Sequence, residues 1–158
     1  MIKLLNANKV VQIKHFFEKC NLSENYINLG VKYILENNIA TYRHLIFRDI
    51  LLPIADMNDS AIQNLVIFEI KKNNPDECSI KILSGSIKKA FLLEAVRKLF
   101  EIIDSQYLRK IKITEWQSTI KPVEKSIINS GFKLEYRYPL DGDALVQYSI
   151  KLEDIYEK

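Results

Sequence analysis

The chain has 158 residues, 47% of them hydrophobic, which is enough for one compact domain with a buried core. Its 23 basic and 20 acidic residues leave a formal net charge of +3, and the lysines are scattered over every segment, which argues against a nucleic-acid interface. The longest hydrophobic run, residues 50–55, contains Pro53 and is too short to span a membrane, and the N-terminus lacks the apolar core of a signal peptide. We therefore expect a single domain over residues 1–158, located in the cytoplasm, with no nucleic-acid or membrane partner.

The two cysteines, Cys20 and Cys78, lie far apart and show no Cys-x-x-Cys spacing. Only two histidines, His15 and His44, are present to join them in a metal site. We therefore expect a reduced protein without a metal cofactor, as is usual in the cytosol.

The first half of the chain predicts one strand, two helices and a less regular segment. Residues 1–5 are expected to form the strand. Two runs of apolar residues at helical spacing follow, and Ser23 is a suitable cap for the second helix. Residues 40–54 have a β-type composition without clean alternation, and we expect their first half to be a strand. The apolar positions of the two helices are Val10, Ile13, Phe17 and Cys20, and then Tyr26, Ile27, Gly30, Tyr33 and Ile34.

The middle of the chain has clearer periodicity. Residues 65–71 and 77–83 are apolar runs joined by residues that favour turns, so they predict an antiparallel hairpin. The apolar spacing over residues 87–103 predicts a strongly amphipathic helix. Alternating apolar and polar residues then predict a strand over residues 110–115.

A short helix and two strands are expected to close the chain. Pro122 suits a first helical turn, and Gly131 follows as a helix stop, where a residue without Cβ can take positive φ. Residues 132–138 and 144–152 predict strands on either side of a turn over residues 139–143. The apolar faces of these three elements are Val123, Ile127 and Ile128, then Phe132, Leu134, Tyr136 and Tyr138, and then Val146, Tyr148 and Ile150.

The segment KIKITEWQSTIKPVEKSIINSGF, residues 110–132, reads as a strand, a short helix and a Gly-Phe turn. Together with the order of the other predicted elements, it resembles the GNAT superfamily of acyl-CoA-dependent N-acyltransferases over essentially the whole chain. The resemblance implies an α/β (α+β) fold, with a mixed, mostly antiparallel sheet flanked by helices. It also implies transfer of an acyl group from acetyl-CoA or another acyl-CoA to an amine, on a small molecule or a peptide that the sequence does not identify.

In that family the loop before the long helix holds the coenzyme A pyrophosphate, with the pattern Q/R-x-x-G-x-G/A. Ser84, Ile87 and Lys89 stand at the three signature positions, and all three depart from it. The segment SGSIKK could still form an anion-binding nest, although a capped helix start is an equally good interpretation. The preceding strand would offer backbone groups to the pantetheine arm. The candidate donor-binding residues are therefore Ile82, Leu83, Ser84, Gly85, Ser86, Lys88 and Lys89.

Many members of the family carry a catalytic tyrosine four residues before the glycine of the Gly-Phe turn, and here that position is Ile127. Glu115 is our candidate base, because it continues an apolar strand face and a carboxylate held among apolar groups is a better proton acceptor. A strand-end residue turned to solvent is the alternative interpretation. Tyr148 is our candidate acid, although a tyrosine on an apolar strand face is more often a core residue.

Two further functions agree with these departures from the family pattern. A GNAT-like fold that has lost acyl transfer would act as a binding or regulatory module. An acyltransferase could instead take its acyl group from an acyl carrier protein, in which case a weakened pyrophosphate site matters less. Lys88, Lys89, Arg97 and Lys98 would then be candidates to meet the acidic carrier.

Overall fold

The chain folds into one mixed sheet with helices on both faces. The computed structural model describes residues 1–19, 26–27, 33, 37–71, 73–85, 89–103 and 107–156, and for residues 26–27, 82–85, 89–90 and 156 it describes the backbone alone. The strands are β1 (Ile2–Leu4), β2 (Tyr26–Ile27), β3 (Leu51–Asn58), β4 (Ala61–Ile70), β5 (Glu77–Gly85), β6 (Lys110–Trp116), β7 (Lys133–Leu140) and β8 (Asp143–Lys151). The helical segments are η1 (Ala7–Lys9), α1 (Val10–Glu18), α3 (Ile39–Phe47), α4 (Lys89–Ile102), α5 (Gln117–Ile120), η3 (Lys121–Val123), α6 (Glu124–Asn129) and α7 (Leu152–Tyr156).

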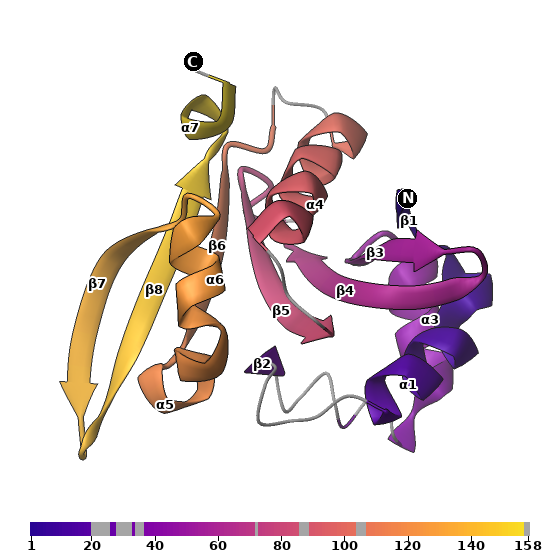
Figure 1. Cartoon of the computed structure of the whole chain (residues 1–158), viewed down its shortest axis with the longest axis horizontal. Helices are drawn as coiled ribbons and strands as arrows, with labels where there is room; N and C mark the ends of the chain where they lie inside the picture. Colours follow the sequence, from indigo (N-terminus) through magenta and orange to yellow (C-terminus); the bar gives the residue numbers. More distant parts are fainter. Residues whose placement is uncertain are drawn as a thin grey trace.

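The order of the strands confirms the predicted fold class. The sheet runs β1-β3-β4-β5-β6-β8-β7, and β2 pairs with β5 off this path (Figure 1). Among the described residues, every strand pair is antiparallel except β5 with β6. The predicted hairpin of residues 65–71 and 77–83 is present as β4 and β5, and the long helix is present as α4.

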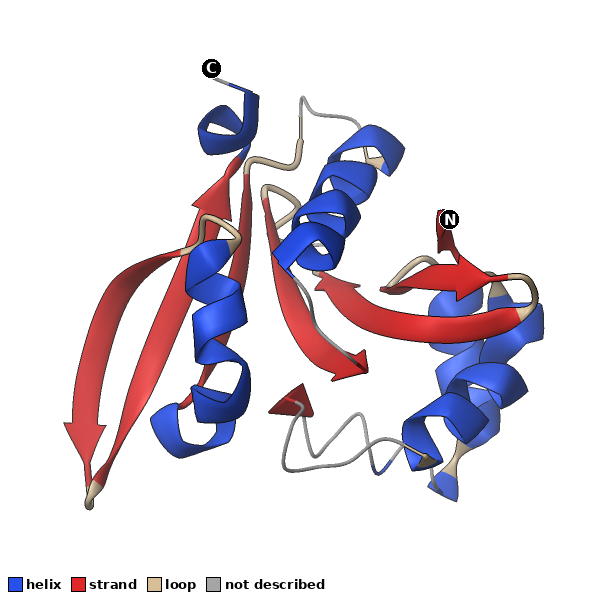
Figure 2. Ribbon diagram, in the orientation of Figure 1, coloured by secondary structure: helices blue, strands red, loops and turns tan. Residues whose placement is uncertain are grey.

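Helices cover both faces of the N-terminal half of the sheet (Figure 2). α1 and α3 pack on one face, in a cluster that includes Ile13 and Tyr42. α4 packs on the other face, where Val96 is fully buried. The adjacent residues Ile54 and Ala55 of β3 belong to opposite clusters, as a strand period of two requires. The continuous apolar sequences of β3 and β4 thus belong to strands buried on both faces.

β5 and β6 separate soon after they meet. Among the described residues, their parallel pairing is confined to Glu77, Cys78 and Ser79 with Lys110, Ile111 and Lys112. Beyond this point β5 continues along β4 and β6 continues along β8, and Figure 2 shows the two strands diverging. A register shift between Ile67 and Phe68 of β4 lies beside β5, and such bulges bend the strands that carry them. The divergence opens the sheet between β5 and β6.

The C-terminal half of the sheet is covered on the face that also holds α4. The segment α5-η3-α6 packs there through Ile120, Val123 and Ile127, which are almost fully buried. Gly131 follows α6 with φ 104°, which confirms the predicted helix stop. On the opposite face, salt bridges join Lys110 to Glu135 and Lys112 to Glu77 at 2.5 and 2.8 Å. These polar pairs explain why lysine alternates with isoleucine along β6.

The predicted strand in the first half of residues 40–54 is wrong. These residues belong to α3, which buries Tyr42 and Ile46, four positions apart on one side of the helix. Asn38 caps this helix, because its side chain accepts the Thr41 N–H at 3.2 Å. The strand of this region begins only at Leu51.

Three smaller predictions also need correction. Tyr26 and Ile27 form a strand instead of part of a helix, while Cys20, Ser23, Gly30 and Ile34 lie outside the described residues. Leu134 does not share a face with Tyr136 and Tyr138, because a register shift follows it in β7. Ile128 points away from the packed side of α6 and is 49% exposed.

Among the described residues, no helix has both the length and the apolar character needed to cross a membrane.

Candidate active site

The two predicted catalytic residues lie on one face of the sheet, just past the point where β5 and β6 separate. Ile113 is the first β6 residue beyond the paired stretch, and it lies opposite Tyr148 of β8. Glu115 follows two residues later and lies opposite Val146. Because alternate residues of a strand share a face, Glu115 and Tyr148 are on the side where α4 and α6 pack. The structure thus brings together two candidates that come from different strands.

Glu115 stands at the border between the core and solvent. On its strand face, Ile111 and Ile113 are 0% and 1% exposed, whereas Glu115 is partly buried. Its Oε1 accepts the N–H of Trp116 at 3.2 Å. The sequence allowed either a base held among apolar groups or a strand-end residue turned to solvent. The structure agrees fully with neither, because the carboxylate is neither enclosed in the core nor fully turned to solvent. Its role as a base stays a prediction.

Tyr148 is a core residue with a carboxylate beside its hydroxyl. It is 5% exposed, and burial raises the pKa of its hydroxyl. The Glu124 carboxylate raises this pKa further, through its negative charge and through hydrogen bonding that favours the protonated phenol. The phenol therefore keeps its proton at neutral pH and is available as a donor. Its role as an acid stays a prediction.

Glu124 was missed by the reasoning from sequence. It is the first residue of α6 and lies three residues before Ile127, the position at which the family resemblance implies a tyrosine. Residues three apart are neighbours on a helix surface. The only sequence feature that could have pointed to Glu124 was a carboxylate three residues before Ile127 in the predicted helix. Nothing in the sequence linked it to Tyr148.

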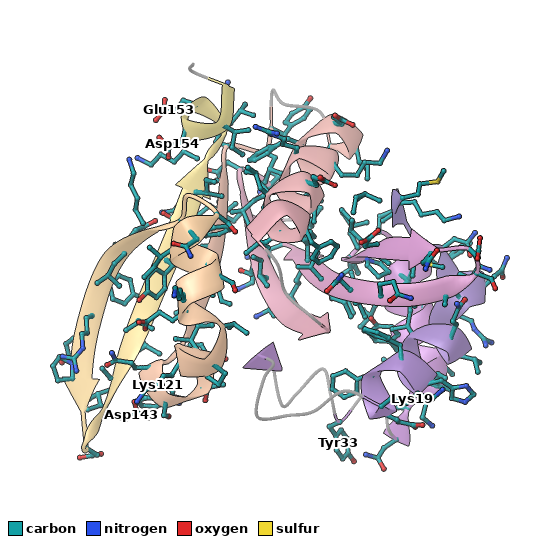
Figure 3. The ribbon with its side chains drawn as sticks, in the orientation of Figure 1. Lys19, Tyr33, Lys121, Asp143, Glu153 and Asp154 are labelled. Atoms are coloured by element: carbon teal, nitrogen blue, oxygen red, sulfur yellow. The ribbon has the colours of Figure 1, made fainter. Side chains whose placement is uncertain are left out.

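Asp143 holds the short helical segment against β8. Its carboxylate accepts the Ser118 N–H at 3.2 Å and the Ser118 hydroxyl at 2.5 Å, and the bond to that hydroxyl is the main reason why the pKa of Asp143 is lowered. Figure 3 shows Asp143 near the tip of the β7–β8 hairpin, beside the helical segment that carries Lys121. From β7, Arg137 Nε donates to Gln117 Oε1 at 3.0 Å. Since α5, η3 and α6 follow one another directly, these bonds help to fix the helical segment that carries Glu124.

The candidate donor loop joins the end of β5 to the start of α4. Ser86, Ile87 and Lys88 lie outside the described residues, and for Ser84, Gly85 and Lys89 the structure gives the backbone alone. β5 ends at Gly85 and α4 begins at Lys89, so the loop leads into a helix N-terminus, as the family resemblance implies. The free N–H groups at such a terminus attract anions.

The backbone of Ile82 and Leu83 is paired on both edges of β5. On the edge towards the opening, Leu83 pairs with Tyr26 and Ile82 with Ile27 of β2. On the other edge both residues pair with β4. A pantetheine arm that used the β5 edge facing the opening would therefore meet β2. The sequence did not predict this strand.

Of the remaining residues singled out in the sequence, Arg97 and Lys98 supply positive charge, and Cys78 is not placed to act as a nucleophile. Arg97 is exposed on α4 and lines a cavity of about 220 Å³, and Lys98 is partly exposed beside it. Cys78 is 1% exposed, and burial raises the pKa of its thiol, so that it is not a thiolate nucleophile at neutral pH. Among the described residues, no group of three or more His, Cys, Asp or Glu side chains could hold a metal ion.

Solved structures resemble this one over nearly the whole chain, although no protein-family model and no curated protein matches the sequence. A probable acetyltransferase from Staphylococcus epidermidis ATCC 12228 has a TM-score of 0.72 and 12% identity, over 96% of this chain and 98% of that chain. A chimera of the spermidine N-acetyltransferase SpeG from Vibrio cholerae with hSSAT has a TM-score of 0.70 and 14% identity, over 100% and 99%. The aminoglycoside acetyltransferase AAC(6')-Ib in complex with coenzyme A has a TM-score of 0.70 and 12% identity, over 100% and 98%.

At sequence identities of 12% to 14%, the structural similarity shows the fold alone. The chain has the GNAT fold, with a single sheet that opens between its parallel strands β5 and β6.

Proposed function

We propose that the protein is an N-acyltransferase that moves an acyl group from acetyl-CoA or another acyl-CoA to an amine. The observation that carries this proposal is the opening between β5 and β6, with Glu115 and Tyr148 on one face just past its apex. The fold supports it, because the similar aminoglycoside acetyltransferase was solved with coenzyme A.

In this proposal the donor lies along β5, with its pyrophosphate at the loop before α4. Backbone N–H groups at the helix start and the serine hydroxyls of the loop would hold the phosphates, and the two lysines would add positive charge. β2 would have to leave part of the β5 edge before a pantetheine arm could pair there. The proposed donor-binding residues are Ile82, Leu83, Ser84, Gly85, Ser86, Lys88 and Lys89. An acyl carrier protein is the alternative donor, and Lys88, Lys89, Arg97 and Lys98 would then meet its acidic surface.

The proposed reaction needs three proton transfers. Glu115 takes one proton from the ammonium form of the substrate, directly or through water. The amine then attacks the thioester carbonyl, a C–N bond forms, and the C–S bond breaks with its electron pair going to sulfur. Tyr148 protonates the sulfur, which Ile127 cannot do. The nitrogen then gives its second proton back to Tyr148, directly or through water, so that a neutral amide and a neutral phenol remain. Holding donor and amine side by side supplies much of the acceleration.

The acceptor is proposed to be the amine of a small molecule or a peptide. Two similar structures are named for spermidine and for aminoglycosides, which are small amines. The partly buried Glu115 gives a cationic acceptor one carboxylate to approach.

A non-catalytic binding module is the second candidate function. It is favoured by the pairing of β2 with the donor edge of β5, and by the isoleucines at positions 87 and 127. Such a module would keep the fold but would not catalyse acyl transfer.

Donor binding can be tested by thermal unfolding with acetyl-CoA, longer acyl-CoA esters and free coenzyme A. A ligand that binds the native state alone stabilises it by about 2.7 kcal/mol at a hundredfold excess over its Kd. We expect stabilisation of the wild type at low salt, and less of it in a Lys88→Ala/Lys89→Ala variant. Lys133→Ala/Lys151→Ala is a matched control that removes two charges elsewhere. Equal stabilisation of both variants would remove the loop lysines from the site, and no stabilisation by any donor would contradict the proposed donor class.

A further inference from the structure

A cavity of about 640 Å³ lies between α1 and the turn that joins β3 to β4, and we call it the α1 groove. The Gln12 side chain ties its two walls together, because Nε2 donates to the Ser60 carbonyl at 2.5 Å. Asp59, next to Ser60 in the turn, is exposed and does not line the groove. Lys19, at one end of the groove, lies on the opposite side of the molecule from Lys121, so the groove is separate from the candidate active site (Figure 3).

The titratable side chains that line the α1 groove are all basic. Lys9 and Lys19 flank α1, His15 lies between them, and all three are exposed. Of the described residues that line the groove, none carries a carboxylate. Glu18 precedes Lys19 in the chain, but it pairs with Lys14 at 3.9 Å and lies outside the lining. The groove therefore favours an acidic ligand.

The surface between these basic groups is apolar. Ile62 is 8% exposed, and the partly buried Phe16 packs against the core cluster to which Ile62 belongs. Val11 adds an exposed apolar side chain to the lining. The volume of the groove falls in the range of about 300–1,000 Å³ that ligand sites occupy. A bound chain can thus bury an apolar side chain in the middle and keep its charges near the ends.

The spacing of the lysines indicates an extended ligand. Lys9 and Lys19 are separated by about 15 Å along α1, at a rise of 1.5 Å per residue. Two anionic groups on one chain match this spacing better than a single small anion does. In an extended peptide, residues rise about 3.3 Å and alternate residues share a face, so acidic residues four positions apart can flank an apolar residue on one face.

We propose that the α1 groove binds an extended, acidic peptide segment of a partner protein, with an apolar residue of that segment at its centre. The basic ends of the groove pair with two carboxylates of the segment, and Phe16 and Ile62 contact the apolar side chain between them. This interaction goes beyond acyl transfer, because no residue of the groove belongs to the proposed catalytic or donor-binding residues.

The test titrates a blocked pentapeptide, Glu-Ser-Leu-Ser-Glu, into the full chain at low salt and follows the histidine ring signals by NMR. We expect the His15 signals to shift to saturation, while those of His44, on α3 and outside the groove, stay unchanged. Added salt should weaken the binding, because the ion pairs are exposed. Peptides with glutamine for both glutamates, or serine for leucine, should bind more weakly.

Two variants connect the binding to the lysines. Lys9→Ala/Lys19→Ala should raise the peptide Kd about tenfold, because an exposed ion pair contributes a few-fold each. Lys14→Ala/Lys133→Ala is the matched control, since it removes two charges outside the groove, and its Kd should equal that of the wild type. Both variants should unfold at the wild-type temperature. Unchanged His15 signals with the acidic peptide, equal binding of the glutamine or serine peptide, or an unchanged Kd in Lys9→Ala/Lys19→Ala would each overturn the proposal.

Discussion

At the scale of single residues, Glu115 is the proposed base of acyl transfer. If this carboxylate is the base, Glu115→Gln should keep the fold and the donor affinity, but lower the rate of acyl transfer by ~100-fold, because a positioned base contributes about that much. The wild-type rate should rise with pH as the ammonium group of the substrate loses its proton. Steady-state kinetics with thiol release as the signal would measure both effects.

Glu69→Gln is the matched control for that experiment. Glu69 is also a partly buried strand carboxylate, and it pairs with Lys81 at 3.7 Å. Its variant should turn over like the wild type. A Glu115→Gln variant as fast as the wild type would leave the enzyme in place and remove our assignment of its base.

Gly131 sets the geometry of the turn between α6 and β7, and a stability measurement tests this. At φ 104° a side chain is strained, and an added Cβ would lie 3.4 Å from Ile150 Cδ1. We expect Gly131→Ala to lower the free energy of unfolding by roughly 1–3 kcal/mol in urea titrations. Gly142 has φ 80° in the β7–β8 turn with nothing within 4 Å of a Cβ, so Gly142→Ala should cost less. Equal losses would show that the Ile150 contact adds nothing.

At the scale of secondary-structure elements, the sequence predicted those whose periodicity matches their burial. α4 and β8 each bury one regular apolar face, so their patterns were clear. α3 was mistaken for a strand because its β-branched and aromatic residues favour strands locally, while packing of Tyr42 and Ile46 decides the helix. β2 could not be predicted, because two residues carry no period and its pairing partner lies more than 50 residues away in the chain.

β2 also provides a prediction of its own, since it covers the β5 edge that a pantetheine arm would use. Replacing Tyr26 and Ile27 by proline removes backbone N–H donors and should weaken the pairing with Ile82 and Leu83. If β2 and the donor compete, acyl-CoA should bind this variant more tightly than the wild type, in proportion to the lost pairing energy. Calorimetric titration would measure the Kd. Unchanged or weaker binding would mean that the donor lies elsewhere or binds alongside β2.

At the scale of the whole molecule, the site arises where two halves of one sheet meet. The pairing of β5 with β6 joins them over three residues of each strand, and α4 and α6 share one core cluster across the junction. The sequence predicted both halves and their order, because each has its own hairpin and helix. It could not predict that the Glu124 carboxylate would raise the pKa of Tyr148, since the short helix and the strand come together only in the folded chain.

Formation of the acylated product would show whether this fold transfers an acyl group. Wild-type protein would be mixed with acetyl-CoA, or a longer acyl thioester, and a panel of small amines and peptides, and the N-acylated amine would be detected by mass spectrometry beside the free thiol. The account predicts equal amounts of amide and thiol, formed far faster than without protein and slowed in Glu115→Gln and Tyr148→Phe. An absence of amide above the protein-free rate, with every acyl-CoA and acyl carrier protein donor, would contradict it and leave the non-catalytic binding module as the function of this fold.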